Sequence, residues 1–373
     1  MKARFVVLWA LALLVCAFGV HADGNESVDQ CACQQQCCGC SYDCADQFYY
    51  DCCGDCFCAG CVEFNSRYTY RMLSHVENLR KERVLLHAKR CGDIEPCRLY
   101  SGFSLIAIAD YQHSNRTSKF GYLMRHPTSS NQIGKDVTEA VLHSMQFQFT
   151  GALCNWITVF GEYVYYPEQS FGAGTITTVT RNLTEGRKGY VLLGDLNCFP
   201  VYAAIGKMDT PFGQMFSVNP FTSSTMWHAF GGLAYGALLG YDCNGINASL
   251  MAVQGGAQFR AHNTPVFGTA VPSRLTNWVA DFNYSFELCD ICAQVGASYT
   301  RSSAYVQNFP VQHFNSGDRN NPAWTAYGQL RWCDWVLKGS FAQTTRVWPG
   351  THNPNAPLDV FAAHKVSSFD VGA

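Results

Sequence analysis

The sequence has few charged residues and lacks the motifs by which common enzymes are recognised. Only 14% of the 373 residues are charged, against about a quarter in ordinary soluble domains. The net charge of -2 comes without a basic block, so nothing predicts a nucleic-acid partner. There is no HExxH, GxSxG, phosphate loop or dinucleotide fingerprint. We therefore expect a protein that is not an enzyme and that needs no cofactor or metal.

Long apolar runs are missing after residue 22, so the sequence predicts no transmembrane helix there. Before that point, Lys2 and Arg4 precede an apolar stretch over residues 5–20. Val20-His21-Ala22 then fits a cleavage site with small residues. We predict a removable signal peptide over residues 1–22, with a membrane anchor as the alternative.

Cysteine, by contrast, is abundant, with 20 in the chain, one of them inside the predicted signal peptide. Eleven lie between Cys31 and Cys61, where bulky apolar residues are scarce. Such a segment cannot build a hydrophobic core and depends on cross-links. In an exported protein we expect disulfides, while the paired C-x-x-C spacings leave a zinc site as the alternative. The 19 remaining cysteines are an odd number, so at least one is free or pairs with another chain.

Residues 66–90 show the spacing of a helix, with Leu73, Val76, Leu79 and Arg83 recurring every three to four positions. The composition changes again near residue 98, where strand-like stretches begin. We predict a signal peptide over 1–22, a Cys-rich periplasmic segment over 23–65, a helix and linker over 66–97, and an outer-membrane β-barrel over 98–373.

Apolar and polar residues alternate in the stretches that follow residue 100. In residues 278–288, Phe282 and Tyr284 fall on one face, and Asp281 and Asn283 fall on the other. This period of two predicts strands with one apolar and one polar face. In a soluble sandwich the apolar face is the core, whereas in a membrane barrel it faces lipid and the polar face lines the lumen. Strands of about 9–13 residues and aromatic strand ends favour the barrel.

Five cysteines recur at separations of 44, 45, 46 and 44 residues, each in a short turn between two such strands. Turn-forming residues flank each of them, which is the pattern of a repeated hairpin. Tight turns alternate with loops of about twenty residues, the asymmetry of outer-membrane barrels. We expect these cysteines to share one rim with the Cys-rich segment and to form disulfides within or between chains. They are Cys154, Cys198, Cys243, Cys289 and Cys333.

The predicted fold class is all-β: a transmembrane antiparallel up-and-down β-barrel of which about 12 strands are visible, with about 12–16 in full. A β-sandwich or a β-propeller is the alternative, although a propeller blade needs four strands per repeat. The last strand begins at Val366 and ends without a terminal aromatic residue, so we expect the barrel to be incomplete at its C-terminus. The inward polar residues predicted to line the pore are Asp281, Glu287, Gln329, Arg331 and Lys338.

Residues 205–222 contain Gly-Lys-x-x-x-Pro-Phe-Gly followed by Asn219-Pro-x-Thr. This stretch resembles the signature of the Legionella-type siderophore porins (the LbtU family), in which Asp stands where this chain has Asn219. The order of signal peptide, short helix and barrel is also similar, and the resemblance covers residues 66–373. The motif positions are Gly206, Lys207, Pro211, Phe212, Gly213 and Pro220.

The resemblance implies a TonB-independent outer-membrane channel for ferric siderophore. The Cys-rich segment departs from that family and resembles the disulfide-linked envelope proteins of chlamydia-like bacteria. We expect contact with outer-membrane lipid, uptake of a small solute or ferric siderophore, and disulfide partners among copies of itself or other Cys-rich envelope proteins. The alternatives are a disulfide-crosslinked structural envelope protein or surface adhesin anchored by a barrel, and a secreted soluble Cys-rich β protein.

Overall fold

The structure is a computed structural model. It describes residues 57–59, 62–64, 72, 80–113, 135–165, 184–215, 224–254, 275–288, 291–305, 320–333, 335–352 and 360–373. The chain divides into two compact units, residues 1–34 and 35–373, and every described residue belongs to the second. The predicted signal peptide, most of the Cys-rich segment, Cys289 and Pro220 lie outside the described residues.

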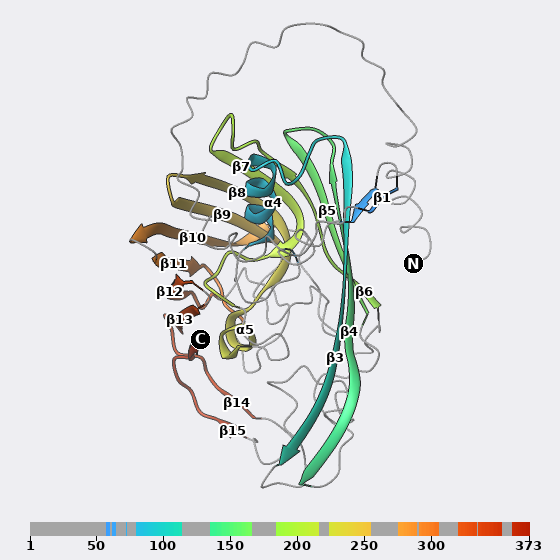
Figure 1. Ribbon diagram of the computed structural model, residues 1–373. Helices are drawn as coiled ribbons and strands as arrows, with labels where there is room; N and C mark the ends of the chain where they lie inside the picture. Colours follow the sequence, from blue (N-terminus) through green and yellow to red (C-terminus); the bar gives the residue numbers. More distant parts are fainter. Residues whose placement is uncertain are drawn as a thin grey trace, which may run out of the picture. The chain divides into compact units, whose positions relative to one another are not determined.

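One antiparallel sheet contains nearly all of the described strands, and each long strand pairs with the next in the sequence (Figure 1). This confirms the all-β, up-and-down fold class. The sheet runs in the order β1 (Phe57–Ala59), β2 (Val62–Phe64), β3 (Arg98–His113), β4 (Asp136–Ala152), β5 (Ile157–Tyr165), β6 (Thr184–Leu193), β7 (Val201–Asp209), β8 (Leu233–Cys243), β9 (Ile246–Gln254), β10 (Leu275–Leu288), β11 (Ile291–Thr300), β12 (Ala323–Trp332), β13 (Trp335–Thr344) and β16 (Ser367–Gly372).

The pairing departs from a closed barrel in two places. β2 pairs in parallel with β3 through Val62 and Leu99, although the rest of the long sheet is antiparallel. In the described residues, β16 pairs with β13 and ends the sheet without a partner on its other edge. Part of the edge of β3 that a closing strand would use is therefore taken by β2. A separate pair, β14 (Thr351–His352) with β15 (Val360–Phe361), lies in the connection before β16.

Short turns and long connections alternate, as the sequence predicts. The short turns follow β4, β6, β8, β10 and β12, and in an up-and-down sheet they all lie at one end. The long connections follow β3, β5, β7, β9, β11 and β13 and lie at the opposite end. β3 and β4, of 16 and 17 residues, are longer than the expected strands, and their pairing shifts register between Ile106 and Ala107.

The two faces of the sheet differ in polarity: exposed side chains are mostly apolar, and many buried ones are polar or charged. On β10, the Phe282 side chain is 52% exposed, whereas the neighbouring Asp281 is only 5% exposed. The same contrast holds on β13, where Leu337 is exposed and Lys338 is buried. Because successive side chains of a strand point to opposite faces, each strand presents an apolar outer face and a buried inner face. The outer face also carries Phe147, Phe149, Leu239, Leu250, Val295, Trp324, Leu330, Phe341 and Phe369.

The core lies on the inner face, where connections and helices cover the strands. Helix α4 (Lys81–Arg90) places Val84, Leu85 and Leu86 among buried side chains of β3 to β8. Its sequence suits the helix dipole, since Glu82 lies in the first turn and basic residues lie in the last turn. The second helix, α5 (Thr225–Phe230), lies in the connection between β7 and β8. No helix among the described residues is long and apolar enough to span a membrane.

Candidate functional site

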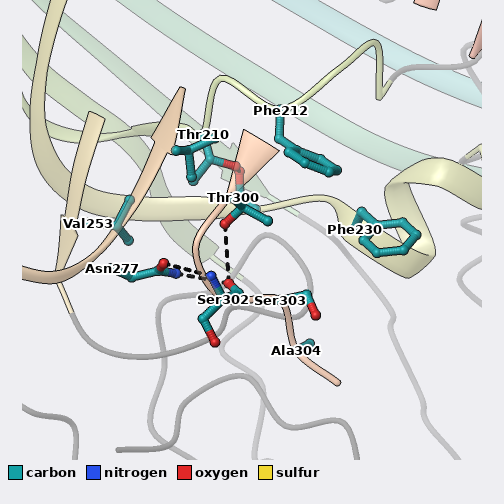
Figure 2. A pocket seen from close by; sticks show the side chains of 11 residues that line it. Thr210, Phe212, Phe230, Val253, Asn277, Thr300, Ser302, Ser303 and Ala304 are labelled. Atoms are coloured by element: carbon teal, nitrogen blue, oxygen red, sulfur yellow. Dashed lines mark hydrogen bonds between the residues drawn. The ribbon is translucent and has the colours of Figure 1, made fainter. Parts of the chain in front are cut away.

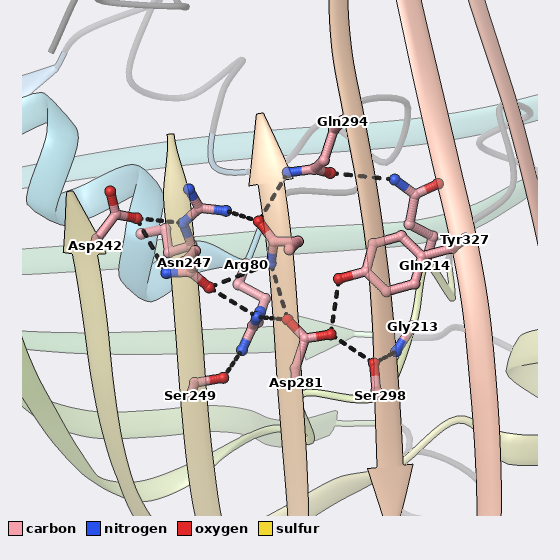
Figure 3. Close-up of polar contacts among 12 residues, drawn as sticks. Arg80, Gly213, Gln214, Asp242, Asn247, Ser249, Asp281, Gln294, Ser298 and Tyr327 are labelled. Carbon is pink, nitrogen blue, oxygen red and sulfur yellow. Dashed lines mark hydrogen bonds and ion pairs between the residues drawn. The ribbon is translucent and has the colours of Figure 1, made fainter. Parts of the chain in front are cut away.

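The start of helix α4 is held against the polar inner face of the sheet by Arg80, the residue that precedes the helix. Its Nη1 atom donates to Ser249 Oγ at 2.6 Å on β9. Its Nη2 atom donates to Asn247 Oδ1 at 3.2 Å on β9 and to Asp281 Oδ2 at 2.5 Å on β10. Figure 3 shows the guanidinium among these three acceptors. One arginine therefore joins α4 to two adjacent strands.

A second arginine repeats this arrangement one turn further along the helix. The Nε atom of Arg83 donates to Asp242 Oδ2 at 2.7 Å, and its Nη1 atom donates to Asn283 Oδ1 at 3.3 Å. His87 lies four residues on, with its Nε2 atom 3.3 Å from Asp242 Oδ1. Arg83, His87 and Asp242 are all buried. Because residues three and four apart share one face of a helix, this face of α4 is matched to the carboxylates of the sheet.

Asp281 is the centre of the polar network and binds side chains of the next two strands of the sheet, β11 and β12. Its Oδ1 atom accepts from Ser298 Oγ at 2.5 Å and from Tyr327 Oη at 2.7 Å. Its Oδ2 atom accepts from Asn283 Nδ2 at 2.9 Å, in addition to the bond from Arg80. A buried carboxylate is stable when it is paired and its lone pairs are filled. Asp281 meets that condition and links α4 to β10, β11 and β12.

Burial changes the proton affinities of the α4 side chains. Burial opposes the charge of Arg80, but the carboxylate of Asp281 acts more strongly together with its other neighbours, and the pKa of Arg80 is raised. Burial lowers the pKa of His87, although the Asp242 carboxylate acts in the opposite direction. Burial also raises the pKa of Glu82. At neutral pH, α4 therefore faces the sheet with charged arginines and an uncharged imidazole.

Docking of α4 is expected to weaken in mild acid because of His87. Its lowered pKa means that the unfolded chain binds more protons below the ordinary pKa of about 6.5, so stability falls as the pH decreases. Asp242, Arg83 and Arg90 are the charged groups that act on this imidazole. The pKa of Glu82 is raised, so its contribution to the stability changes with pH in the opposite direction. We expect His87→Gln to lose less stability than the wild type between about pH 7 and pH 5, measured by thermal unfolding in detergent. A constant difference between the two proteins across this range would contradict it.

The connection between β7 and β8 is described at residues 210–215 and 224–232, and both parts contact the inner face of the sheet; we refer to these two parts as the inner connection. The backbone N–H of Gly213 donates to Ser298 Oγ at 2.9 Å on β11. The side chain of Gln214 donates from Nε2 to Gln294 Oε1 at 3.3 Å on the same strand (Figure 3). The inner connection thus leaves β7 and reaches a strand four places along the sheet.

The second half of the inner connection reaches further, to the last strand. Ser224 caps α5 by accepting from Trp227 N at 2.9 Å, and its hydroxyl donates to Met215 O at 2.5 Å. The hydroxyl of Thr225 donates to Phe369 O at 2.5 Å on β16. β7 and β16 are far apart in the strand order, so the described parts of this connection contact widely separated strands of the sheet.

Aromatic side chains fill the inner face beside the inner connection. The ring of Phe230 lies 5.8 Å from that of Phe212 and 5.7 Å from that of Tyr305. The chain of contacts continues from Tyr305 to Trp348 at 5.5 Å between ring centroids. All four side chains are buried. Instead of a lumen lined by polar residues alone, the inner face carries a packed aromatic group, which the connections supply rather than the strands.

A pocket lies where the inner connection meets the strand ends on the side of the long connections (Figure 2). Asn277 and Ser302 close its polar side, since Asn277 Nδ2 donates to Ser302 O at 3.0 Å and Ser302 N donates to Asn277 Oδ1 at 3.1 Å. Its wall is thus part hydroxyl and amide and part aromatic ring. The lining residues are Thr210, Phe212, Phe230, Gly232, Val253, Asn277, Val279, Thr300, Ser302, Ser303 and Ala304.

The residues predicted to line a pore lie at different depths. Asp281 is buried beneath the arginine that precedes α4. Gln329 and Lys338 are direct partners across β12 and β13, and Lys338 is buried. Glu287 is exposed and Arg331 is partly exposed, both near the short-turn end, where each is a register partner of the same residue of β11. The structure therefore brings Gln329 and Lys338 together on β12 and β13, whereas Asp281 on β10 binds the arginine before α4.

Two residues of the Gly-Lys motif have distinct environments on β7. Gly206 has φ +144°, and a Cβ there would lie 2.3 Å from Gly189 O on β6, so only glycine fits this close approach. Lys207 lies on the outer face, with its Nζ atom donating to Gly186 O at 3.3 Å and lying 5.9 Å from the ring centre of Tyr235. The alternation of β7 places Lys207 away from the interior.

The remaining motif residues begin the inner connection. Pro211 and Phe212 are buried. Gly213 has φ +63°, a left-handed conformation that favours glycine, and the turn directs its N–H toward β11. Pro220 lies outside the described residues. The Pro-Phe-Gly part of the motif is therefore the bend that sends the inner connection across the inner face.

Of the predicted rim cysteines that the structure describes, Cys154, Cys198 and Cys333 lie in short turns, and Cys243 is the last residue of β8 beside such a turn. Cys154 and Cys333 are exposed thiols, and so is Cys97, just before β3. Cys97 Sγ lies 3.5 Å from Leu153 O, which brings it beside the turn of Cys154. Cys198 donates to Asp195 Oδ2 at 3.8 Å, Cys243 is buried, and Cys289 lies outside the described residues.

The residues of α4 that bind the sheet were not predicted as site residues. Arg80, Arg83 and His87 appear in the sequence as ordinary polar positions of a helix, and Asn247 and Ser249 as inward residues of a strand. The one available signal was their spacing, since an arginine, an arginine and a histidine at intervals of three and four lie on one face. Among the described residues, no group of three His, Cys, Asp or Glu side chains is arranged to hold a metal ion.

Comparisons with known proteins find a distant structural similarity but no related sequence. No family model matches it, and no curated protein matches it. Among solved structures, it is similar to Salmonella typhi OmpF in complex with daunomycin, with a TM-score of 0.32 and 10% sequence identity, over 72% of this chain and 84% of that chain. A similarity this low does not transfer a function.

Proposed function

We propose that this protein is an outer-membrane channel that admits small solutes without coupling to TonB. The supporting observation is the reversed polarity of its up-and-down sheet, with exposed Phe282 and Leu337 beside buried Asp281 and Lys338. Soluble proteins rarely expose a continuous apolar surface, whereas the outer face of a membrane barrel is an apolar band against lipid. The outer face of this sheet is suited to outer-membrane lipid as its partner.

Aromatic residues near the strand ends fit the same environment. Trp332 and Trp335 are exposed on either side of the turn between β12 and β13, and Trp156 is exposed in the turn before β5. Tryptophan and tyrosine are enriched at membrane–water interfaces, where an apolar ring meets a polar boundary. These side chains would form the interfacial belt on the short-turn side.

The short-turn end is proposed to face the periplasm, together with the Cys-rich segment. Helix α4 approaches that end, because Lys89 Nζ donates to Asn155 O at 2.5 Å and to Cys154 O at 3.3 Å in the turn between β4 and β5. Short periplasmic turns and long outer loops are the rule in bacterial barrels. On this proposal, residues 1–22 direct export, 23–65 form the Cys-rich periplasmic segment, 66–97 supply the inner helix, and 98–373 form the membrane sheet.

Ferric siderophore is the first solute to test, supported by the resemblance of residues 205–222 to the Legionella-type siderophore porins. On this proposal the described interior is a closed state, because α4 and the inner connection pack against the inner face. A solute larger than an ion must displace one of them. The long connections and the pocket beside Phe212 and Phe230 lie on the side from which an external solute would arrive.

Single-channel conductance of the refolded full-length protein in planar bilayers tests this proposal, with and without thiol reductant. We expect discrete openings in KCl, together with swelling of proteoliposomes in a small neutral sugar. A change on reduction would connect the cysteines to opening. Absence of conductance in both states, in a protein that inserts into the bilayer, would reject the channel.

A disulfide-braced structural envelope protein is the second candidate, because the inner face is packed and exposed thiols lie in the short turns or, in the case of Cys97, beside one. On this candidate the sheet is an anchor, and Cys97, Cys154 and Cys333 are available to other Cys-rich chains. It predicts covalent oligomers on non-reducing gels of isolated envelopes, which reductant converts to monomer. Monomer alone in both lanes would exclude bonding between chains.

The reduced, folded protein is expected to show unequal thiol reactivity. Cys154 and Cys333 are exposed and should react rapidly with a maleimide, whereas Cys243 is buried and should react at least about tenfold more slowly, because access controls the reaction. Peptide mapping after timed labelling measures the three rates. Equal rates in the folded protein, with denatured protein as the reference, would contradict this arrangement.

A further inference from the structure

A row of polar side chains crosses the inner face on three neighbouring strands. Gln294 on β11 is the register partner of Gln329 on β12, and Gln329 is the register partner of Lys338 on β13. Directly opposite residues of antiparallel strands have Cβ atoms about 4.5–5.5 Å apart. Gln214 of the inner connection reaches the same row through its bond to Gln294. Four side chains from four segments therefore meet at one level of the sheet.

The first member of the row is held rigidly. The amide nitrogen of Gln294 donates to Asn283 Oδ1 and to Ser285 Oγ, each at 3.2 Å. Its amide oxygen accepts from Gln214. With both ends bound, Gln294 fixes the orientation of Gln214, whose side chain is buried. The row is thus ordered on one side by the network that also holds α4.

The other members have polar atoms that no described residue satisfies. Lys338 Nζ is buried without a hydrogen-bond partner among the described residues, and its residue is only 3% exposed. Gln329 Oε1 and Gln214 Oε1 are likewise buried and unbonded within the described part of the chain. A buried ammonium group without a bonded partner is costly. Such a group is retained where it has a task, which in a channel is contact with the solute.

We propose that Lys338, Gln329 and Gln214 form a binding site for a hydroxylated oxyanion, such as a hydroxycarboxylate. The ammonium of Lys338 is a donor with three protons and no acceptor, so it selects a carboxylate or a phosphate oxygen. The two amide oxygens are acceptors and select a hydroxyl group on the same ligand. Hydroxylated oxyanions would then be the class of solute that the proposed channel admits. The role of the site in transport rests on the channel proposal.

One acidic side chain acts on the site from the neighbouring strand. Asp370 on β16 attracts Lys338 electrostatically and is the register partner of Ser340, two residues from the lysine. Its side chain is partly exposed, and Lys338 Nζ makes no described hydrogen bond to it. Asp370 reduces the net charge of the site without filling the bonding positions of the ammonium. No described residue fills these bonding positions, which is why we assign them to a ligand oxygen.

Calorimetric titration of the refolded protein with citrate, tricarballylate and inorganic phosphate tests the site. Tricarballylate is citrate without its hydroxyl group, so the pair isolates the role of the glutamine oxygens. We expect citrate to bind more tightly than tricarballylate by several-fold. Lys338→Met should weaken citrate by about tenfold or more, since charge-assisted bonds are the stronger kind. Lys338→Arg should retain most of the binding, and Gln329→Leu should remove the preference for citrate.

Lys207→Met is the matched control, because that lysine lies on the outer face beside Tyr235 and should leave citrate binding unchanged. Retained heat-modifiable migration on gels would establish that each variant folds. No saturable citrate binding by the wild type, or equal binding by Lys338→Met, would overturn the site. If the protein conducts KCl but does not bind citrate, only the binding-site proposal is rejected. If it binds citrate but never conducts, the binding site is retained and the channel proposal is rejected.

Discussion

Replacing Arg83 by alanine is expected to open the proposed channel and to lower the stability of the α4 region. The substitution leaves Asp242 buried without its 2.7 Å partner. Removing one member of a buried ion pair costs about 3–5 kcal/mol, because the remaining charge is uncompensated. We expect α4 to detach from β8, the mean conductance to rise severalfold above wild type, and proteases to cleave the helix faster. Planar bilayers and timed proteolysis measure the two effects.

The exposed pair Arg98–Glu95 provides the control. It has a similar distance, 2.8 Å, but both side chains are about half exposed, at 46% and 55%, and exposed pairs contribute about 0–1 kcal/mol. Arg98→Ala should therefore leave the conductance and the proteolysis rate near wild type. The double variant Arg83→Ala/Asp242→Ala removes the orphan charge, so it should be more stable than the sum of the single variants predicts. Unchanged conductance and proteolysis in Arg83→Ala would show that α4 does not close the interior.

Replacing Gly206 by alanine is expected to prevent correct pairing of β6 with β7. The added Cβ would lie 2.3 Å from Gly189 O and 2.6 Å from the Cα atom of Tyr190, both backbone atoms. The φ of +144° adds strain for any residue with a side chain. We expect a loss of about 2–4 kcal/mol of stability, from backbone strain and overpacking together. Urea unfolding followed by tryptophan fluorescence measures it, and the yield of refolded protein should fall with it.

Gly186→Ala is the matched control on the neighbouring strand. A Cβ at Gly186 would meet no atom within 4 Å, so alanine there should be tolerated or slightly stabilising, because it restricts the unfolded chain. The difference between the two variants isolates the close approach of β7 to β6. If Gly206→Ala refolds and unfolds like Gly186→Ala, the glycine of the motif has no steric role.

The strands could be predicted because polar and apolar residues alternate along them with a period of two, and the burial of their side chains follows the same alternation. Phe282 and Asp281 differ in polarity and lie on opposite faces, so the pattern predicts both the strand and its two environments. The short turns could be predicted for a similar reason, since Asn244-Gly245 combines two residues with positive φ between β8 and β9. These are local signals, and they need no knowledge of what lies across the interior.

The filling of the inner face could not be predicted in this way. The residues at the start of α4 that bind the sheet are charged, so a pattern that places charged side chains in water and apolar ones in the core assigns them to the surface. Arg80 and Arg83 find their partners more than 150 residues away in the sequence, at Asp281 and Asp242. Phe230 and Trp348 lie in connections, where no strand period marks them as inward. The bend at Gly213 was recognisable, but its destination on β11 was not.

One hydroxyl group joins the two structures that cover the inner face. Ser298 Oγ accepts from the backbone of Gly213 and donates to Asp281, which accepts from Arg80. A disturbance of the inner connection therefore reaches helix α4 through three consecutive hydrogen bonds. Coupling of this kind is reciprocal: if an arriving solute loosens the helix, detachment of the helix must tune the affinity for the solute by the same factor. The inner connection and α4 would then open together, because both depend on the hydrogen bonds of Ser298 and Asp281.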